Sequence, residues 1–163
     1  MDKLDAKATV NELLVEIFNH ILPLEERYLK QQGMKISVTE IHILENVNKS
    51  QTKTMSDVAK LQGVTAGTLT VGVDRLVHKG YLIKSKGSKD KRAVYLELTP
   101  LADSALEIHE EFHNSLVNAC VEDLGLEKEK TVVFGLQRIA IFFREEMYRR
   151  WDFMENKGQG KEE

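Results

Sequence analysis

Side chains that can bind a nucleic acid are concentrated between residues 63 and 92. This segment holds seven lysine and arginine residues and two acidic ones, a net charge of +5, although the whole chain of 163 residues carries −3. The rest of the chain therefore carries −8. Because counterion release acts where the basic groups lie, a basic block on an acidic body indicates nucleic-acid binding. A solvated charged loop is the alternative, so the argument depends on the elements that carry the charge.

The stretch from 66 to 79 predicts a helix that reads DNA bases. Leu69, Val73 and Leu76 recur at helical spacing, and we expect them to face the core. At 100° per residue, the opposite side carries Gly67, Thr68, Val71, Asp74, Arg75 and His78. On that side a threonine can hydrogen-bond a base or phosphate, a valine can touch a thymine methyl group, and an arginine can bind guanine or phosphate.

Two glycines, Gly67 and Gly72, lie inside this predicted helix. Each costs about 1 kcal/mol relative to alanine in a helix interior. We therefore expect the helix to approach DNA or a neighbouring helix closely at these positions. Simple tolerance of glycine is the alternative.

A basic hairpin follows the helix. Residues 81–86 and 93–98 predict two strands, and residues 87–92 form the tip. Arg92 is expected to enter the minor groove, whose negative potential attracts arginine. Asp90 is expected to orient Arg92 or to cap the turn. Lys89 and Lys91 are expected to contact phosphates.

Threonines at the predicted helix starts add further DNA contacts. Thr54 and Thr65 are each expected to cap a helix, where free backbone amides can bind phosphate. The DNA contacts predicted from the sequence are Thr54, Thr65, Gly67, Thr68, Thr70, Val71, Arg75, Lys89, Asp90, Lys91 and Arg92.

Local signals predict the elements that position these residues. Ser37 begins a helix with Glu40 completing a capping box, and Gly63 and Gly80 end the two helices that Thr54 and Thr65 begin. A helix-turn-helix followed by a hairpin is typical of a winged DNA reader. The predicted fold is mainly α with a small β-wing, and we call residues 37–99 the winged unit.

Long amphipathic helices are predicted on both sides of the winged unit. One covers residues 4–31, with Pro23 expected to bend or split it. Another begins at Pro100 after the cap Thr99, and a last helix follows a break near Gly125. Residues 1–36 and 100–154 are therefore predicted to form a symmetric dimer, with residues 155–163 as a disordered tail. Folding back on the same subunit is the alternative.

Several classes of protein are excluded by what the sequence lacks. It has no phosphate-binding glycine loop, no nucleophile elbow and no paired CxxC motif, so we expect no enzyme and no cofactor. The lone Cys120 is expected to be structural. No secretory signal and no apolar run of about 18 residues is present, which predicts a cytoplasmic protein away from membranes.

Histidines offer a metal-binding alternative. His109 and His113 lie four residues apart, so their rings can converge from one helix. The predicted alternative ligand set is Glu26, His42, His109 and His113, with Glu25 and Glu40 as further possible ligands. Half-buried histidines are also commonly satisfied by hydrogen bonds, and no metal is favoured from the sequence.

The stretch DKRAVYLELT, from Asp90 to Thr99, resembles the D-x-R signature of the MarR family of bacterial regulators. The resemblance covers nearly the whole chain. It implies a homodimer that binds a near-palindromic double-stranded operator, usually as a repressor. The helix at 66–79 has Gly67 and Val71 where the commoner family pattern has bulkier polar residues, which leaves the operator sequence open.

Within the family, the chain most resembles the repressors of fatty-acid synthesis. The resemblance rests on IFNHIL and LEE in the first helix, ISVTEIH in the second, GTLTVGVDRLVHKGY in the reading helix and IHEEFH in the fifth. It implies long-chain acyl-acyl carrier protein as co-repressor. The acyl chain would lie in an apolar space lined by Ile17, Ile21, Leu24, Ile41, Ile108 and Phe112, residues that an ordinary core would also contain. Zinc-sensing members use a helix pattern similar to that of the histidines, so zinc or another small effector is the alternative.

Overall fold

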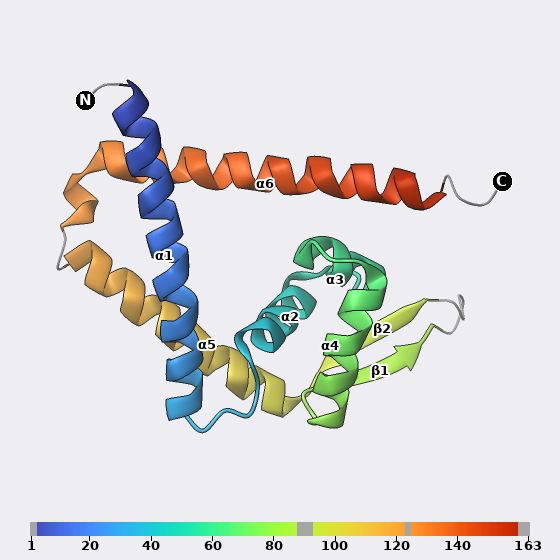
Figure 1. The fold of residues 1–163 in the computed structure, drawn as a ribbon. Helices are drawn as coiled ribbons and strands as arrows, with labels where there is room; N and C mark the ends of the chain where they lie inside the picture. Colours follow the sequence, from blue (N-terminus) through green and yellow to red (C-terminus); the bar gives the residue numbers. More distant parts are fainter. Residues whose placement is uncertain (1–2, 88–92, 123–124, 160–163) are drawn as a thin grey trace.

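The computed structural model describes residues 3–87, 93–122 and 125–159. The elements, in chain order, are α1 (Lys3–Gln31), α2 (Val38–Lys49), α3 (Met55–Gln62), α4 (Ala66–His78), β1 (Leu82–Lys86), β2 (Val94–Leu98), α5 (Pro100–Glu122), the short 3-10 helix η1 (Leu126–Lys128) and α6 (Lys130–Gln159) (Figure 1). The predicted fold, mainly helical with a small β-wing, is confirmed. None of the described helices is long and apolar enough to cross a membrane.

The helix starts and stops predicted in the winged unit are confirmed. The Ser37 hydroxyl accepts from the Glu40 amide, and the Glu40 carboxylate accepts from the Ser37 amide at 2.8 Å, which makes the capping box of α2. Thr54 and Thr65 cap α3 and α4 by accepting from the Asp57 and Thr68 amides. Gly63 ends α3 at φ 68°, a left-handed conformation that favours glycine.

The core of the winged unit lies between α2, α3, α4 and the hairpin. Leu69, Val73 and Leu76 are buried there, as the helical phase predicts. A Cβ atom added at Gly72 would lie 2.5 Å from the Ile43 side chain, so α2 and α4 approach closely at this glycine. The prediction of close approach to a neighbouring helix is confirmed for Gly72.

The wing is an antiparallel hairpin attached to the end of α4. Leu82 pairs with Leu98 and Lys86 with Val94. At its base, the Thr99 hydroxyl donates to the carbonyls of Gly80 and Tyr81 at 2.8 and 3.1 Å. An isolated bridge between Thr54 and Tyr95 places the start of α3 beside β2.

The long helices differ from the sequence predictions at two places. Helix α1 runs unbroken through Pro23, so it is not split there, because proline removes its own N–H donor while the neighbouring residues keep theirs; the bend at Pro23 stays a prediction. Helix α6 continues to Gln159, so residues 155–159 are helical and not a disordered tail, while residues 160–163 lie outside the described residues. The glutamate, lysine and glutamine of this stretch are good helix formers.

Large apolar side chains of α1 and α6 are exposed. In α1 these include Val10, Leu13, Ile17, Phe18, Leu22 and Leu24. In α6 they include Val132, Val133, Phe134, Leu136, Ile141, Phe142, Phe143 and Met147. The described residues of the chain leave these apolar faces uncovered, and Figure 1 shows α6 extending along one side of the molecule.

Candidate DNA-binding surface and buried histidine cluster

Helix α4 presents the polar side that its phase predicts. Gly67, Thr68, Val71, Asp74, Arg75 and His78 are all exposed, and we call this side the reading face. A Cβ atom added at Gly67 would meet nothing closer than the Thr65 hydroxyl at 3.9 Å. The glycine therefore leaves open space on the surface, and its contact with DNA stays a prediction.

The threonines differ in how free their hydroxyl groups are. The hydroxyls of Thr65 and Thr68 lie 3.0 Å apart at the exposed start of α4. The Thr54 hydroxyl accepts from the Asp57 amide at 3.3 Å and lies 3.1 Å from the Thr52 hydroxyl. The Thr70 hydroxyl donates to the Ala66 carbonyl at 2.7 Å, so this half-buried side chain already has a partner within the helix.

The predicted wing contacts Lys89, Asp90, Lys91 and Arg92 lie outside the described residues. The strands that lead to them, β1 and β2, are described. In β1, Lys84 forms an ion pair with Asp74 of the reading face, and Lys86 is exposed. The structure therefore places strand β1 of the wing beside the reading face (Figure 1).

A second group of titratable side chains lies where α1, α2 and α5 meet, and two of its members are buried. Glu25, His42, His109 and His113, which we call the histidine cluster, place one ligand atom each within 4.8 Å of all the others. Glu25 Oε1 lies 2.7 Å from His109 Nε2 and 3.1 Å from His42 Nε2. His113 Nε2 lies 3.1 Å from His109 Nε2. Three imidazoles and a carboxylate are a donor set that fits four-coordinate zinc.

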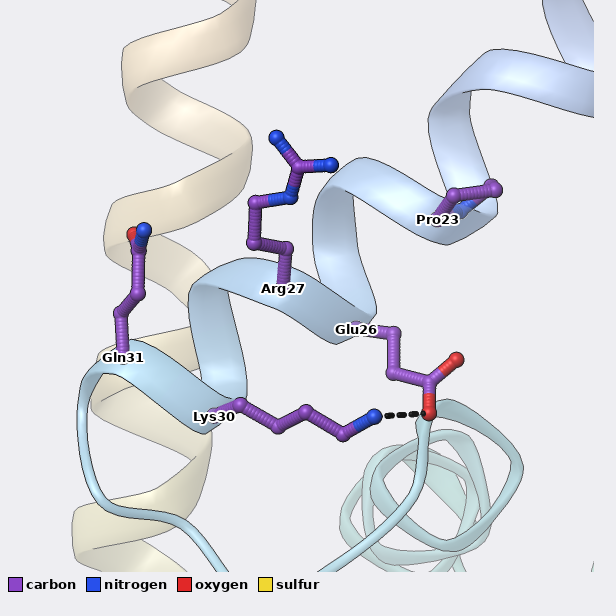
Figure 2. A pocket seen from close by; sticks show the side chains of 5 residues that line it. All are labelled: Pro23, Glu26, Arg27, Lys30 and Gln31. Atoms are coloured by element: carbon purple, nitrogen blue, oxygen red, sulfur yellow. Dashed lines mark ion pairs between the residues drawn. The ribbon is translucent and has the colours of Figure 1, made fainter.

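The alternative ligand set predicted from the sequence contained Glu26, but the structure places Glu25 beside the histidines instead. Glu25 and His109 are each 1% exposed, whereas Glu26 is exposed and pairs with Lys30 at 2.8 Å (Figure 2). Successive residues of a helix point about 100° apart, so only Glu25 faces the packed side of α1. The other acid considered, Glu40, is held by Lys79 and Ser37 instead.

Hydrogen bonds set the charges of the cluster. Burial would lower the pKa of His109, but hydrogen bonds with Glu45 and Glu25 outweigh it and raise this pKa above its ordinary value. Burial and the neighbouring His109 lower the pKa of His113. The hydrogen bond with His109 lowers the pKa of Glu45 to about 2. The two carboxylates therefore favour the protonated form of His109, which is a self-consistent arrangement without metal.

An apolar hollow of about 320 Å³ lies between α1 and α5. It is lined by Leu24, Arg27, Tyr28, Gln31, Phe112, Ser115, Leu116 and Ala119. Only Leu24 and Phe112 belong to the predicted effector pocket. Of the other predicted residues, Ile41 is part of the core, Ile17 is exposed, and Ile21 and Ile108 do not line this hollow. Helical spacing of three, four and seven from Leu24 and Phe112 would have found the missed lining residues.

Two further hollows adjoin these sites. One of about 410 Å³ lies along the C-terminal half of α1 and is lined by Pro23, Glu26, Arg27, Lys30 and Gln31 (Figure 2). It shares Arg27 and Gln31 with the apolar hollow. The other, of about 400 Å³, is lined partly by Glu45, Glu110 and His113, so the histidine cluster can be reached from solvent.

Transcriptional regulators are among the known proteins that this chain resembles. The model of the MarR family matches residues 36–94. The crystal structure of Streptococcus pneumoniae FabT in complex with DNA is 30% identical, covers 85% of this chain and 98% of that chain, and has a TM-score of 0.76. Transcriptional regulator AdcR of the same species is 30% identical over 64% of this chain and 70% of its own. The HTH-type transcriptional repressor YetL of Bacillus subtilis is 26% identical over 80% and 83%.

These relatives confirm the prediction that the chain is not an enzyme. The matched residues include the caps of the winged unit and the reading face. The likeness to FabT extends beyond them to the long helices. On this evidence the chain belongs to the MarR family of DNA-binding transcriptional regulators.

Proposed function

We propose that the chain acts as a homodimer that binds a near-palindromic operator and represses the adjacent genes. The observation that carries this proposal is the combination of an exposed reading face beside the wing with uncovered apolar faces on α1 and α6. A second copy would cover those apolar faces. Two winged units related by a twofold axis then require two DNA half-sites with the same symmetry.

The test begins with selection of a duplex by the purified full chain from a randomised DNA library. We call the recovered DNA the selected duplex. Sedimentation of the free chain and of its complex gives the stoichiometry. An inverted repeat bound by two copies is expected. A single copy bound to a site without internal symmetry would overturn the proposal.

We further propose that the effector is a long-chain acyl group on acyl carrier protein, and that fatty-acid-synthesis genes are controlled. The resemblance of the sequence to the fatty-acid-synthesis repressors of the family and the likeness to FabT support this proposal. The apolar hollow supports it chemically. Its apolar lining suits an acyl chain, and Arg27 at the junction with the neighbouring hollow suits an anionic carrier.

Acyl carrier proteins of increasing chain length provide the test, with the carrier lacking an acyl group as control. We expect affinity for the selected duplex to rise with chain length and to stay unchanged with the control. Leu116→Trp should fill the hollow and remove this response without lowering the basal affinity. Equal affinity with every carrier would overturn the proposed effector.

The second candidate is a metal-responsive regulator, and the histidine cluster favours it. Native mass spectrometry after zinc addition and after chelation separates the two candidates. One zinc per subunit, with DNA binding lost on chelation, would replace the acyl effector by a metal. An acyl response that persists in excess chelator would exclude zinc as the required effector.

A further inference from the structure

Asp74 is an acidic residue placed where acids oppose DNA binding. It is the one carboxylate in the sequence of α4, and it lies on the reading face between Val71 and His78. A carboxylate on a DNA-facing helix repels phosphate groups. In the structure its oxygen pairs with the ammonium group of Lys84, so the charge is compensated by the wing strand.

Lys84 is directed to this partner by the pleat of β1. It pairs in register with Leu96, whose side chain is buried, and it follows the buried Leu82 by two residues. Side chains two apart in a strand share a face, so Lys84 stands on the core side of the hairpin. At this position the lysine lies at the rim of the core, and its ammonium group reaches Asp74 of α4. Its side chain is 30% exposed against 60% for Asp74.

The ion pair is a second point of attachment between α4 and the wing. The first is at the base, where the Tyr81 amide donates to the Leu76 carbonyl at 2.9 Å and Thr99 closes the turn. Among the ion pairs of the described residues, this one joins α4 to the hairpin. The Thr54–Tyr95 bridge and the hydrogen bond from the Leu96 amide to the Lys53 carbonyl hold β2 to the start of α3, and the ion pair adds the corresponding contact between β1 and α4.

We propose that Asp74 and Lys84 are positioning residues that set the direction of the wing relative to the reading face. With that direction fixed, the wing and the reading face meet the DNA together. Lys84 is then a structural cation and not a phosphate ligand. The inference rests on the proposed binding of α4 and the wing to DNA, and it adds a function for the acid on the reading face.

The direction in which one substitution changes the DNA affinity of the full chain tests the inference. Asp74→Asn removes a negative charge, so electrostatics alone predicts tighter binding to any DNA. If Asp74 instead sets the direction of the wing, affinity for the selected duplex should fall by about fivefold or more. Affinity for a scrambled duplex should stay the same or rise. The ratio of the two affinities is measured by fluorescence anisotropy.

A double variant removes the net-charge difference. Asp74→Asn combined with Lys84→Gln has the charge of the wild type, so electrostatics predicts wild-type affinity. Positioning predicts a loss no greater than that of the worse single variant, because both changes break the same contact. Lys84→Arg preserves the ion pair and should retain the affinity. Glu26→Gln breaks the exposed pair on α1 and is the matched control, with an unchanged affinity ratio.

Thermal unfolding of each variant shows that loss of fold does not cause the loss of affinity. Tighter binding by Asp74→Asn, or wild-type affinity of the double variant, would overturn the inference and leave the proposed function intact. If Arg75→Ala and Arg92→Ala both keep wild-type affinity, the DNA surface itself is wrong, which overturns the proposed function and the inference together.

Discussion

Lys79, at the end of α4, donates to both carboxylate oxygens of Glu40 at 2.9 and 2.7 Å. The same carboxylate accepts from the Ser37 amide at the start of α2. One buried side chain therefore caps one helix of the winged unit and binds the end of another. This contact, like the Asp74–Lys84 pair, anchors the helix that carries the reading face.

The Glu40 contact predicts a dependence of stability on pH. Burial would raise the pKa of Glu40, but the hydrogen bonds from Lys79 and Ser37 outweigh it and lower this pKa below 4.5. A lowered pKa in the folded state contributes stability above pH 4.5 that is lost as the pH falls through the folded value. Glu40→Gln should cost about 1–3 kcal/mol at pH 7 and flatten the acid limb of urea unfolding at fixed protein concentration. An unchanged acid limb would contradict this.

The two glycines of α4 should respond to alanine in opposite directions. Gly72→Ala places a Cβ atom 2.5 Å from Ile43, and overpacking of this kind costs about 1–3 kcal/mol. Ile43→Val removes the clashing methyl group and should recover much of that loss. Gly67→Ala meets open space and should stabilise by up to about 1 kcal/mol, while weakening DNA binding if the surface lies against DNA. Chemical denaturation and anisotropy measure the two effects.

Neighbouring acids of α1 should differ sharply in their contribution to stability. Glu25→Gln removes a buried partner of a charged histidine and should cost about 3–5 kcal/mol. Glu26→Gln removes an exposed ion pair worth about 0–1 kcal/mol. The raised pKa of His109 makes its contribution full below pH 6.5 and lost as the pH rises through the folded value. Equal losses from the two variants would contradict the assignment of Glu25.

The apolar face of α6 should control assembly. Phe143→Asp places a charge on that face and should weaken dimerisation by about 2–4 kcal/mol, because buried aromatic side chains dominate interface energies. Leu61→Asp makes the same kind of change at an exposed leucine of α3 and should leave the dimer intact. Sedimentation at micromolar concentration distinguishes these outcomes. A fully dimeric Phe143→Asp variant would remove α6 from the proposed interface.

Arginines of the reading face and wing should carry most of the specific affinity. Arg75→Ala should cost about 1–3 kcal/mol of binding to the selected duplex. If Arg75 binds phosphate, the slope of log K against log salt concentration should also fall by about 1. Arg92→Ala is expected to abolish specific binding while the protein stays folded. Anisotropy titrations over a range of salt concentrations measure both effects.

Local physical chemistry made much of the winged unit predictable from sequence. Ser37, Thr54 and Thr65 cap helices because a hydroxyl beside free amides acts within one turn. The phase of α4 followed from Leu69, Val73 and Leu76 in the same way. The split at Pro23 and the disorder of residues 155–159 were wrongly predicted because proline and polar composition lower helix stability without preventing a helix.

The sequence by itself determined the winged helix-turn-helix, the basic reading surface and the membership of a regulator class. Tertiary structure decided which residues meet across helices. The packing of the helices brings Glu25, not Glu26, to the histidines and places Gly72 next to Ile43. It also pairs Lys79 with Glu40 and Lys84 with Asp74. Capping and periodicity act over one or two turns, whereas these contacts depend on how separate helices rotate and pack, which no local pattern encodes.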